Sequence, residues 1–153
     1  MNEWGKSCRA AGADDVIRYT EEDFAEGVHR ITSRRGVDVV YDSVGRDTFE
    51  GSLQTLRPRG LLVLFGQSSG AVPPFDLNRL NGAGSLFVTR PSLAHYTADS
   101  KELGKRAKAV FDAIAEETLE IRIGGEFPLS EAAAAHRALE ARATSGKLLL
   151  RPA

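Results

Sequence analysis

The chain has 153 residues, 42% of them hydrophobic and 27% charged, with a formal net charge of -1. This composition predicts a soluble globular protein with a sizeable core. It argues against nucleic acid or a membrane as partner, because there is no basic patch and no apolar run of roughly 18 residues. A single cysteine, Cys8, excludes an internal disulfide and a multi-cysteine zinc site. The first residues lack the apolar core of a signal peptide, so a cytoplasmic location is expected.

Short apolar runs alternate with helical patterns along the chain, which is the order typical of an α/β fold. Residues 14–19 (DDVIRY) predict a first, brief strand. A helix is expected to follow, with Thr20 as its cap and Asp23 completing a capping box. Gly36 is expected to terminate this helix, because glycine tolerates the left-handed conformation found at helix ends.

Three further strands are predicted in the central part of the chain. Residues 37–44 (VDVVYDSV) contain a continuous apolar run, which is typical of a parallel strand covered on both faces. Residues 61–66 (LLVLFG) predict the next buried strand, and residues 85–89 (SLFVT) predict the last one. The long loop over 67–84 is of a length that usually carries function or is disordered.

Helical spacing of apolar residues occurs at two later places. Phe49, Leu53 and Leu56 form a stripe that predicts a helix, which Pro58 ends because proline cannot continue it. A longer amphipathic helix is predicted from the apolar residues between positions 103 and 114.

The C-terminal part has a different pattern. Residues 119–123 (LEIRI) alternate in the manner of a strand with one solvated face. Ser130 is expected to cap a helix over 131–142, and residues 147–152 (KLLLRP) predict a final short strand. Because these two strands lie outside the alternation of strands and helices, we expect them to belong to a different sheet.

Ligands of open α/β sheets bind beyond the carboxyl ends of the strands. This rule brings together Tyr19 and the segments 42–45 (DSVG), 65–70 (FGQSSG) and 89–91 (TRP). The glycines let the backbone approach a ligand, and the glutamine and serines offer neutral donors and acceptors. No acid–base pair, nucleophile elbow or P-loop is present in these segments. Such a site suits chemistry that belongs to a cofactor, for example hydride transfer.

Each of these features also has a structural interpretation. The segment 65–70 fits a flexible exit from a strand as well as it fits a cofactor turn. Asp42 fits a cap of the following helix better than a chemical role. Tyr19 fits an ordinary aromatic at a strand end. The three histidines are scattered and fit surface or packing positions better than ligand positions.

Three long segments resemble one known family when they are taken in order. They are GVDVVYDSVGRDTFEGSLQTLRPRGLLVLFGQSSG (36–70), GSLFVTRPSLAHYT (84–97) and PLSEAAAAHRALEARATSGKLLL (128–150). They closely resemble the C-terminal half of zeta-crystallin-like quinone oxidoreductases, which are zinc-independent medium-chain dehydrogenases/reductases. The resemblance runs from about residue 10 to the end, and the order of the segments is more diagnostic than any single glycine motif.

The resemblance implies NADPH as the cofactor and a quinone as the small-molecule hydride acceptor. It implies no catalytic residue and no metal ligand within this chain. Arg142 also fits a helix end, where a cation favours the dipole, but a guanidinium is equally suited to bidentate pairing with phosphate. The positions that match the family's cofactor contacts are Tyr19 and Arg142 near the adenosine phosphate, Val44 near the adenine, Phe65, Gly66, Gln67 and Ser68 near the nicotinamide riboside, and Thr89 near the nicotinamide.

The expected fold class is α/β. The resemblance implies an incomplete Rossmann-type parallel sheet, equivalent to strands 3–6, plus C-terminal helices and strands that belong to the family's catalytic domain. It divides the chain into a non-family segment 1–9, a partial dinucleotide-binding domain 10–118 and a return segment 119–153. The family's glycine-rich turn has no counterpart here. Because that turn holds the pyrophosphate, the isolated chain is expected to bind NADPH weakly or not at all.

Three functions follow from these observations. The chain is interpreted first as the nucleotide-binding portion of an NADPH-dependent quinone oxidoreductase. The alternatives are a non-catalytic dimerisation or binding remnant and a truncated gene product. Without its family neighbours, the strand 37–44 is expected to be an exposed apolar edge. The resemblance also implies that strand 85–89 is the edge through which the family dimerises. The chain is therefore expected either to form a homodimer through the edge of strand 85–89 or to associate with a missing N-terminal half.

Overall fold

The structure is a computed structural model that describes residues 3–141 and 144–152. The chain forms two compact units, Met1–Ala98 and Asp99–Ala153. Within the described ranges, no helix has both the length and the hydrophobicity needed to cross a bilayer.

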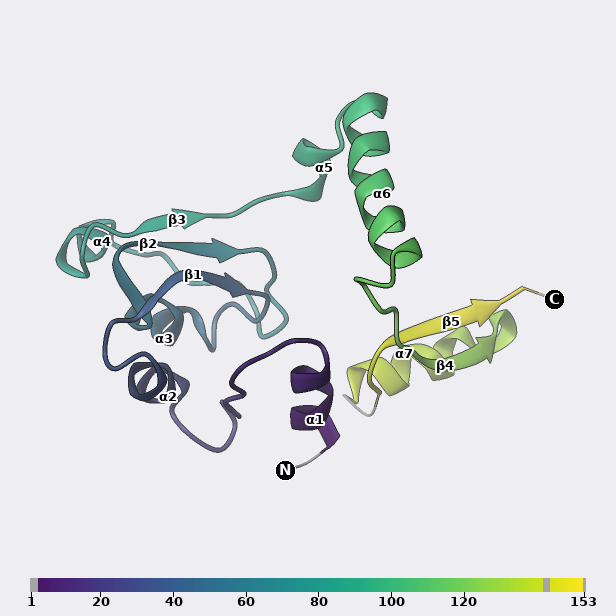
Figure 1. Ribbon diagram of the computed structural model, residues 1–153, viewed down its shortest axis with the longest axis horizontal. Coiled ribbons are helices and arrows are strands. Elements are labelled where there is room, and N and C mark those ends of the chain that lie inside the picture. The colour runs from purple at the N-terminus through teal and green to yellow at the C-terminus, as the bar shows by residue number, and fades with distance from the viewer. Residues whose placement is uncertain (1–2, 142–143, 153) are drawn as a thin grey trace. The chain divides into compact units, whose positions relative to one another are not determined.

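A parallel sheet with the strand order β1-β2-β3 forms the centre of the first unit (Figure 1). Its strands are β1 (Val37–Asp42), β2 (Leu56–Leu64) and β3 (Phe87–Thr89). Because all three strands run in the same direction, their carboxyl ends lie at one edge of the sheet. This arrangement confirms the predicted α/β class, and it confirms that β1 is an edge strand.

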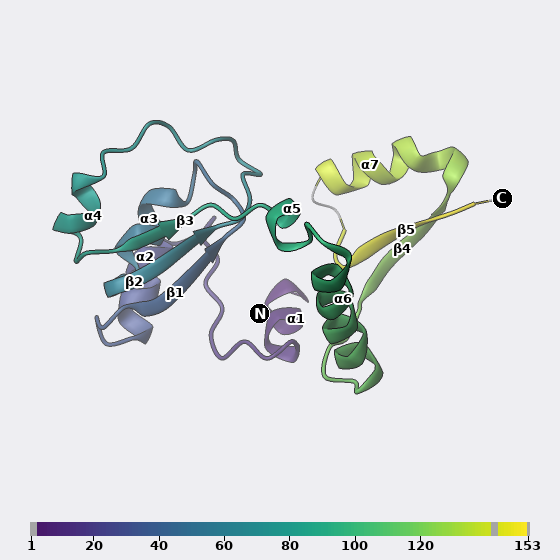
Figure 2. The ribbon, with the colours of Figure 1, turned by 90° about the horizontal axis from the view of Figure 1, so that it is seen from above.

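The helices of the first unit include two that pack near the sheet. Helix α3 (Phe49–Gln54) contacts β1 and β2, and α2 (Phe24–Ile31) lies beside α3 (Figure 2). The others are α1 (Glu3–Ala10), α4 (Asn78–Gly82) and α5 (Leu93–Tyr96).

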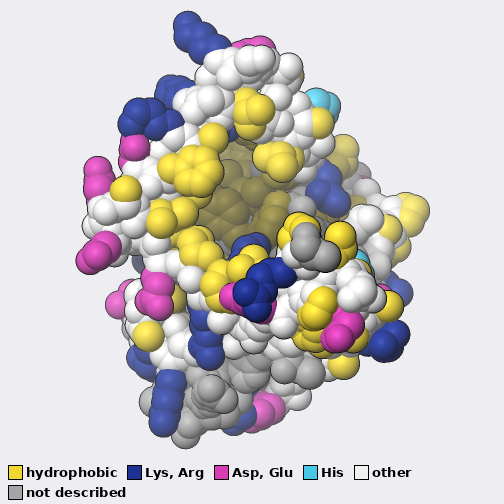
Figure 3. Space-filling view, turned by 90° about the vertical axis from the view of Figure 1, so that its right-hand side faces the viewer, with side chains coloured by type: hydrophobic (Ala, Val, Ile, Leu, Met, Phe, Trp, Pro, Cys, Tyr) yellow, Lys and Arg dark blue, Asp and Glu magenta, His cyan; other side chains and the backbone are white. Residues whose placement is uncertain are grey.

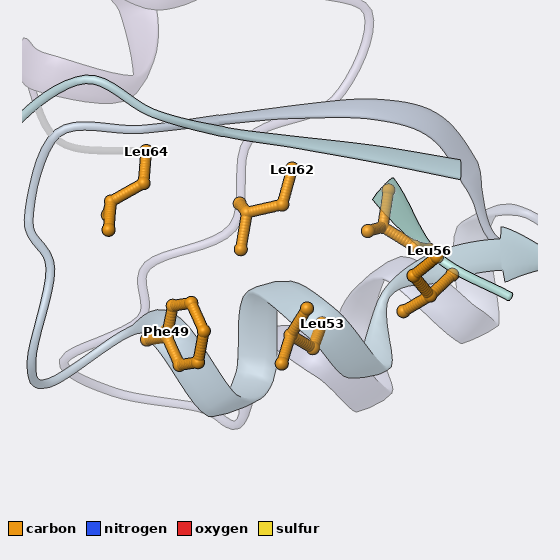
Figure 4. Close-up of a cluster of buried hydrophobic side chains, with 6 residues drawn as sticks. Phe49, Leu53, Leu56, Leu62 and Leu64 are labelled. Atoms are coloured by element: carbon orange, nitrogen blue, oxygen red, sulfur yellow. The ribbon is translucent and has the colours of Figure 1, made fainter. Parts of the chain in front are cut away.

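A small hydrophobic core fills the space between the sheet and α3 (Figure 4). Phe49 and Leu53 point from the helix toward Leu62 and Leu64 of β2. Leu62 is fully buried. Each such side chain contributes about 1.5–3 kcal/mol on burial. The core is completed by Leu56 and Leu86.

The opposite face of the sheet is open to solvent. Tyr41 is 73% exposed and Phe87 is 61% exposed, and Val39 is also exposed. Figure 3 shows many hydrophobic side chains, in yellow, at the surface of the molecule. The prediction that the strand 37–44 is covered on both faces is therefore wrong for the described part of the chain. Parallel sheets are normally covered on both sides by their crossover helices, and here α2 and α3 serve only one side.

Three predictions in the first part of the chain are wrong. Residues 15–18 carry no regular secondary structure, because in the described part of the chain no strand lies beside them to complete a hydrogen-bonded ladder. Helix α2 begins at Phe24, and its cap is Asp23 rather than Thr20. The Asp23 carboxylate accepts hydrogen bonds from two backbone N–H groups of the first turn, at 2.8 and 3.2 Å. The helix ends at Ile31, five positions before Gly36, the predicted terminator, which lies just before β1.

The boundary between α3 and β2 also differs from its prediction. Leu56 begins β2 instead of ending the helix, and its side chain enters the core from the strand. Pro58 lies inside β2, where the pairing shifts from Val37–Leu56 to Val39–Leu61. Such an irregularity is a place where a strand tolerates proline, because the missing N–H is not needed for the ladder.

The second unit contains α6 (Ser100–Ala115), β4 (Ile123–Pro128), a 3₁₀ turn (Leu129–Glu131), α7 (Ala132–Glu140) and β5 (Lys147–Arg151). Strands β4 and β5 pair in parallel as a separate sheet, which confirms the prediction of a different sheet. The strand predicted at 119–123 begins only at Ile123. Ser130 does not cap α7, because it belongs to the 3₁₀ turn, and the cap position is Glu131.

Candidate cofactor site

Two turns leave the sheet side by side at the carboxyl ends of β1 and β2. The first turn is Ser43–Gly45 and the second is Phe65–Gly70. N–H groups of the second turn donate to carbonyl groups of Asp42 and the first turn. The bonds are Phe65 N–H to Asp42 O at 2.9 Å, Gly66 N–H to Asp42 O at 3.2 Å, Ser68 N–H to Ser43 O at 3.2 Å and Ser69 N–H to Val44 O at 2.9 Å.

Side chains and further backbone groups strengthen this pairing. The Ser69 hydroxyl donates to the Val44 carbonyl at 2.8 Å and accepts the Asp47 N–H at 3.0 Å. The Arg46 N–H donates to the Gly70 carbonyl at 3.1 Å. The two turns therefore form one hydrogen-bonded surface, and the segment 65–70 is not a loose exit from the strand.

Glycines permit the close approach of the two turns. A Cβ atom on Gly66 would lie 2.3 Å from the carbonyl oxygen of Ser43 and 2.7 Å from its Cα. Gly45 has a φ of +90°, and a Cβ atom there would lie 2.8 Å from the carbonyl oxygen of Gly70. Both positions are consequently restricted to glycine by contact with backbone atoms, which cannot rotate away.

Asp42 is a buried carboxylate beneath this surface, with only 4% of the residue exposed. It accepts hydrogen bonds from the N–H groups of Val44 (2.8 Å) and Gly45 (3.0 Å). It also accepts from the hydroxyl groups of Thr48 (2.8 Å) and Ser52 (2.9 Å). Burial raises the pKa of Asp42, but the hydrogen bonds from Gly45, Thr48, Ser52 and Val44 outweigh burial and hold the pKa below its usual value.

The predicted capping role of Asp42 is wrong in its detail. The cap position of α3 is Thr48, whose side chain makes no cap hydrogen bond. Asp42 instead binds hydroxyl groups of Thr48 and Ser52, and so ties the helix to the first turn. The signal for these contacts in the sequence was the pair of hydroxyl residues, Thr48 and Ser52, that follows the acid.

A pocket of about 280 Å³ lies beside β1, and we call it the β1 pocket. Tyr19 and Val44 both line it, so the structure brings these two predicted residues together. Its apolar floor consists of Ile17, Phe24, Val28 and Val40. The complete lining is Ile17, Tyr19, Phe24, Val28, Val40, Tyr41, Asp42, Ser43, Val44, Thr48 and Ser52.

The predicted cofactor contacts are placed as follows. Val44 lies in the first turn, and the four residues from Phe65 to Ser68 lie in the second. Thr89 ends β3, where it pairs with Val63 of β2, and is therefore one strand further along the same edge. Arg142 lies outside the described residues. Prediction missed Ser69 as the residue whose hydroxyl joins the two turns.

Comparison with known proteins identifies the family. The sequence model of the zinc-binding dehydrogenases matches residues 11–150. The chain belongs to the zinc-binding dehydrogenase family. It is 48% identical over 149 residues to quinone oxidoreductase 1 of Escherichia coli, covering 96% of this chain and 46% of that protein. It is 43% identical over 151 residues to 2-haloacrylate reductase of a Burkholderia species, covering 98% of this chain and 45% of that protein.

Solved structures of this family have the same fold. The crystal structure of Escherichia coli quinone oxidoreductase complexed with NADPH superposes with a TM-score of 0.94 at 46% identity, covering 99% of this chain and 47% of that one. The resemblance to zeta-crystallin-like quinone oxidoreductases is thus confirmed. The chain spans about half the length of these relatives, and the matched part is their C-terminal half.

The family is named for zinc, which proteins bind through clusters of Cys, His, Asp or Glu side chains. In residues 3–141 and 144–152, no three side chains of the His, Cys, Asp or Glu type lie close enough together to hold a metal ion. The described residues therefore do not fit a zinc site.

Proposed function

We propose that this chain supplies the nucleotide-binding part of an NADPH-dependent oxidoreductase that transfers a hydride to a quinone or a related enone. The observation that carries the proposal is the pair of hydrogen-bonded, glycine-containing turns at the carboxyl ends of β1 and β2. The conformation of this half closely matches that of a quinone oxidoreductase in complex with NADPH. Two relatives, a quinone oxidoreductase and a 2-haloacrylate reductase, support a reductase function for this chain.

NADPH supplies the hydride, and the residues of this chain bind and orient it. Val44 would pack against the adenine, and Tyr19 would lie near the adenosine phosphate. Both residues line the β1 pocket. The turn Phe65–Ser68 would receive the nicotinamide riboside, and the exposed Gln67 and Ser68 would offer it hydrogen bonds. Gly66 keeps this turn in close contact with the first turn. Thr89, at the end of β3, would lie near the nicotinamide.

The proposal extends to Arg142 and to the division of the chain. A guanidinium at Arg142 would pair with the 2′-phosphate that distinguishes NADPH from NADH. Residues 10–118 correspond to the partial dinucleotide-binding domain, residues 119–153 to the return segment of the catalytic domain, and residues 1–9 to a segment outside the family pattern.

A fusion protein tests this function. The N-terminal half of Escherichia coli quinone oxidoreductase 1, which this chain does not match, is joined to the start of this chain. We expect the fusion to oxidise NADPH in the presence of 1,4-benzoquinone within roughly tenfold of the parent enzyme's kcat/KM, since about 1.4 kcal/mol of lost transition-state stabilisation costs a factor of ten. The loss of NADPH absorbance measures the reaction.

The chain alone is the control for the fusion. It is expected to show no turnover and only weak NADPH binding by calorimetry, because each missing charge-assisted hydrogen bond to phosphate costs about 1.5–3 kcal/mol. A folded fusion that leaves NADPH unoxidised would contradict the proposal and favour a non-catalytic binding role.

We also propose a homodimer through the edge of β3. In the described sheet β3 has a neighbour on one side only, and Phe87 and Val88 are exposed there. Phe87→Lys is expected to shift the chain from dimer to monomer in sedimentation equilibrium. Leu93→Lys, at a residue that is 76% exposed but lies in α5, is the matched control and should leave the mass unchanged. A wild-type chain that sediments as a stable monomer would refute the dimer.

A further inference from the structure

The long loop that follows the second turn is anchored to the hydrophobic core. Residues 71–80, which we call the strap, begin directly after Gly70 and end in α4. The strap side chains that are partly buried against the core are Val72, Phe75 and Leu80. The ring of Phe75 meets the ring of Phe49 edge to face, with the ring centroids 5.1 Å apart. The strap is therefore a packed segment of the first unit.

A charged pair fastens the strap to α3. The Arg79 guanidinium donates one hydrogen bond to each carboxylate oxygen of Glu50, and the bond to Oε1 is 3.0 Å long. The same guanidinium lies over the ring of Phe75, 4.7 Å from its centroid. The hydrogen bonds from Arg79 hold the pKa of Glu50 below its usual value. We call the side chains of Glu50, Phe75 and Arg79 the latch.

The latch closes a ring of contacts that includes both turns of the cofactor site. Glu50 lies in the first turn of α3, near Thr48 and Ser52, whose hydroxyl groups bind Asp42 beneath the first turn. The first turn is hydrogen-bonded to the second, and the second turn continues into the strap. The strap returns to α3 through Arg79. The strap is therefore held at both ends, and its first end is the second turn.

We propose that Glu50 and Arg79 are positioning residues that hold the second turn in the conformation that receives NADPH. This proposal rests on the proposed function, because it concerns the same cofactor site. Both side chains are about half exposed and lie outside the two turns, so they act through the strap and α3. A bidentate pair that also lies over an aromatic ring is stronger than the usual exposed ion pair.

Hydrogen exchange on the full chain tests the positioning without NADPH or quinone. Glu50→Gln removes the charge and keeps the length of the side chain. The amides of Ser68, Ser69 and Gly70 close the hydrogen bonds within and between the turns. We expect these amides to exchange about threefold to fivefold faster in the variant. The amide of Leu62, in the centre of β2, should keep its rate, because the latch acts on the turn and not on the sheet.

Matched variants separate the latch from a general effect of removing a surface charge. Glu102→Gln is the control, because Glu102 forms a similarly exposed pair with Arg106 within α6. It should leave exchange in the second turn unchanged. Arg79→Gln should reproduce the effect of Glu50→Gln, and the double variant should exceed neither, because both substitutions remove the same interaction.

The fusion protein tests the consequence for cofactor binding. Glu50→Gln and Arg79→Gln should each raise KM for NADPH about threefold to fivefold and leave kcat nearly unchanged, because neither side chain touches the reacting atoms. Glu102→Gln should leave both constants unchanged. An inactive wild-type fusion would contradict the proposed function, whereas hydrogen exchange decides separately whether the latch holds the turn.

Four results would overturn the inference. The first is unchanged exchange at Ser68, Ser69 and Gly70 in Glu50→Gln. The second is an equal acceleration at Leu62, which would show that the pair stabilises the whole unit and not the turn. The third is a double variant whose effect is the sum of the two single effects. The fourth is an active fusion in which both substitutions leave KM for NADPH unchanged.

Discussion

Replacing Asp42 with asparagine is expected to lower the free energy of unfolding by about 2–4 kcal/mol, because an amide presents an NH₂ group to donors that need an acceptor. The carboxylate is buried and receives hydrogen bonds from two backbone N–H groups and two hydroxyl groups. Asparagine keeps the shape of the aspartate side chain but has only one acceptor oxygen in place of two. Unfolding in urea, monitored by circular dichroism, measures the loss of unfolding free energy.

Asp38→Asn is the matched control on the same strand. Asp38 is an exposed carboxylate that pairs with Arg35 and Arg57, and exposed ion pairs are largely screened by solvent. Its replacement is expected to change stability much less than Asp42→Asn. Equal effects of the two substitutions would show that the buried network around Asp42 does not stabilise the fold.

The Asp42 network also predicts a dependence of stability on pH. Its folded pKa lies below the ordinary value, which is about 3.9 for an unfolded chain. The stabilisation is therefore fully present above that unfolded pKa and is lost as the pH falls through the folded pKa. The difference in unfolding free energy between the wild type and Asp42→Asn should thus shrink below about pH 4. A difference that stays constant on acidification would contradict this assignment.

Gly66→Ala is expected to destabilise the chain by about 1–3 kcal/mol, because an added methyl group forces well-packed backbone apart. The new Cβ atom would lie 2.3 Å from the Ser43 carbonyl oxygen. The two turns must separate, and the hydrogen bond from Ser68 N–H to that same oxygen, now 3.2 Å long, is lost. In the fusion protein the same substitution should raise KM for NADPH, since this surface receives the cofactor.

Gly104→Ala provides a control of opposite sign. Gly104 lies within α6, and a Cβ atom there would meet nothing within 4 Å. Alanine should therefore raise the free energy of unfolding by up to about 1 kcal/mol through its higher helix propensity. If both glycine substitutions changed the free energy of unfolding by the same small amount, the close contact between the two turns would not contribute to stability.

The strands that could be predicted are those whose neighbours are also within the chain. Residues 61–64 and 87–88 are apolar and pair with adjacent strands, so local pattern and tertiary pairing agree. Residues 15–18 have a similar local pattern but lack a strand beside them, and they form no strand. Strand formation depends on a partner, which a local sequence pattern does not contain.

By itself, the sequence determined the order of the strands from β1 to β5, the glycine-containing turns that end β1 and β2, and the family that these segments share. Those features are local, because apolar runs and glycine positions are set by neighbouring residues. Only the tertiary structure decided that Ser69 joins the two turns and that Asp42 binds Thr48 and Ser52. Only the tertiary structure, likewise, showed the apolar hollow between β1 and residues 15–18. These contacts join residues from different elements, and chain folding alone brings them within hydrogen-bonding or packing distance.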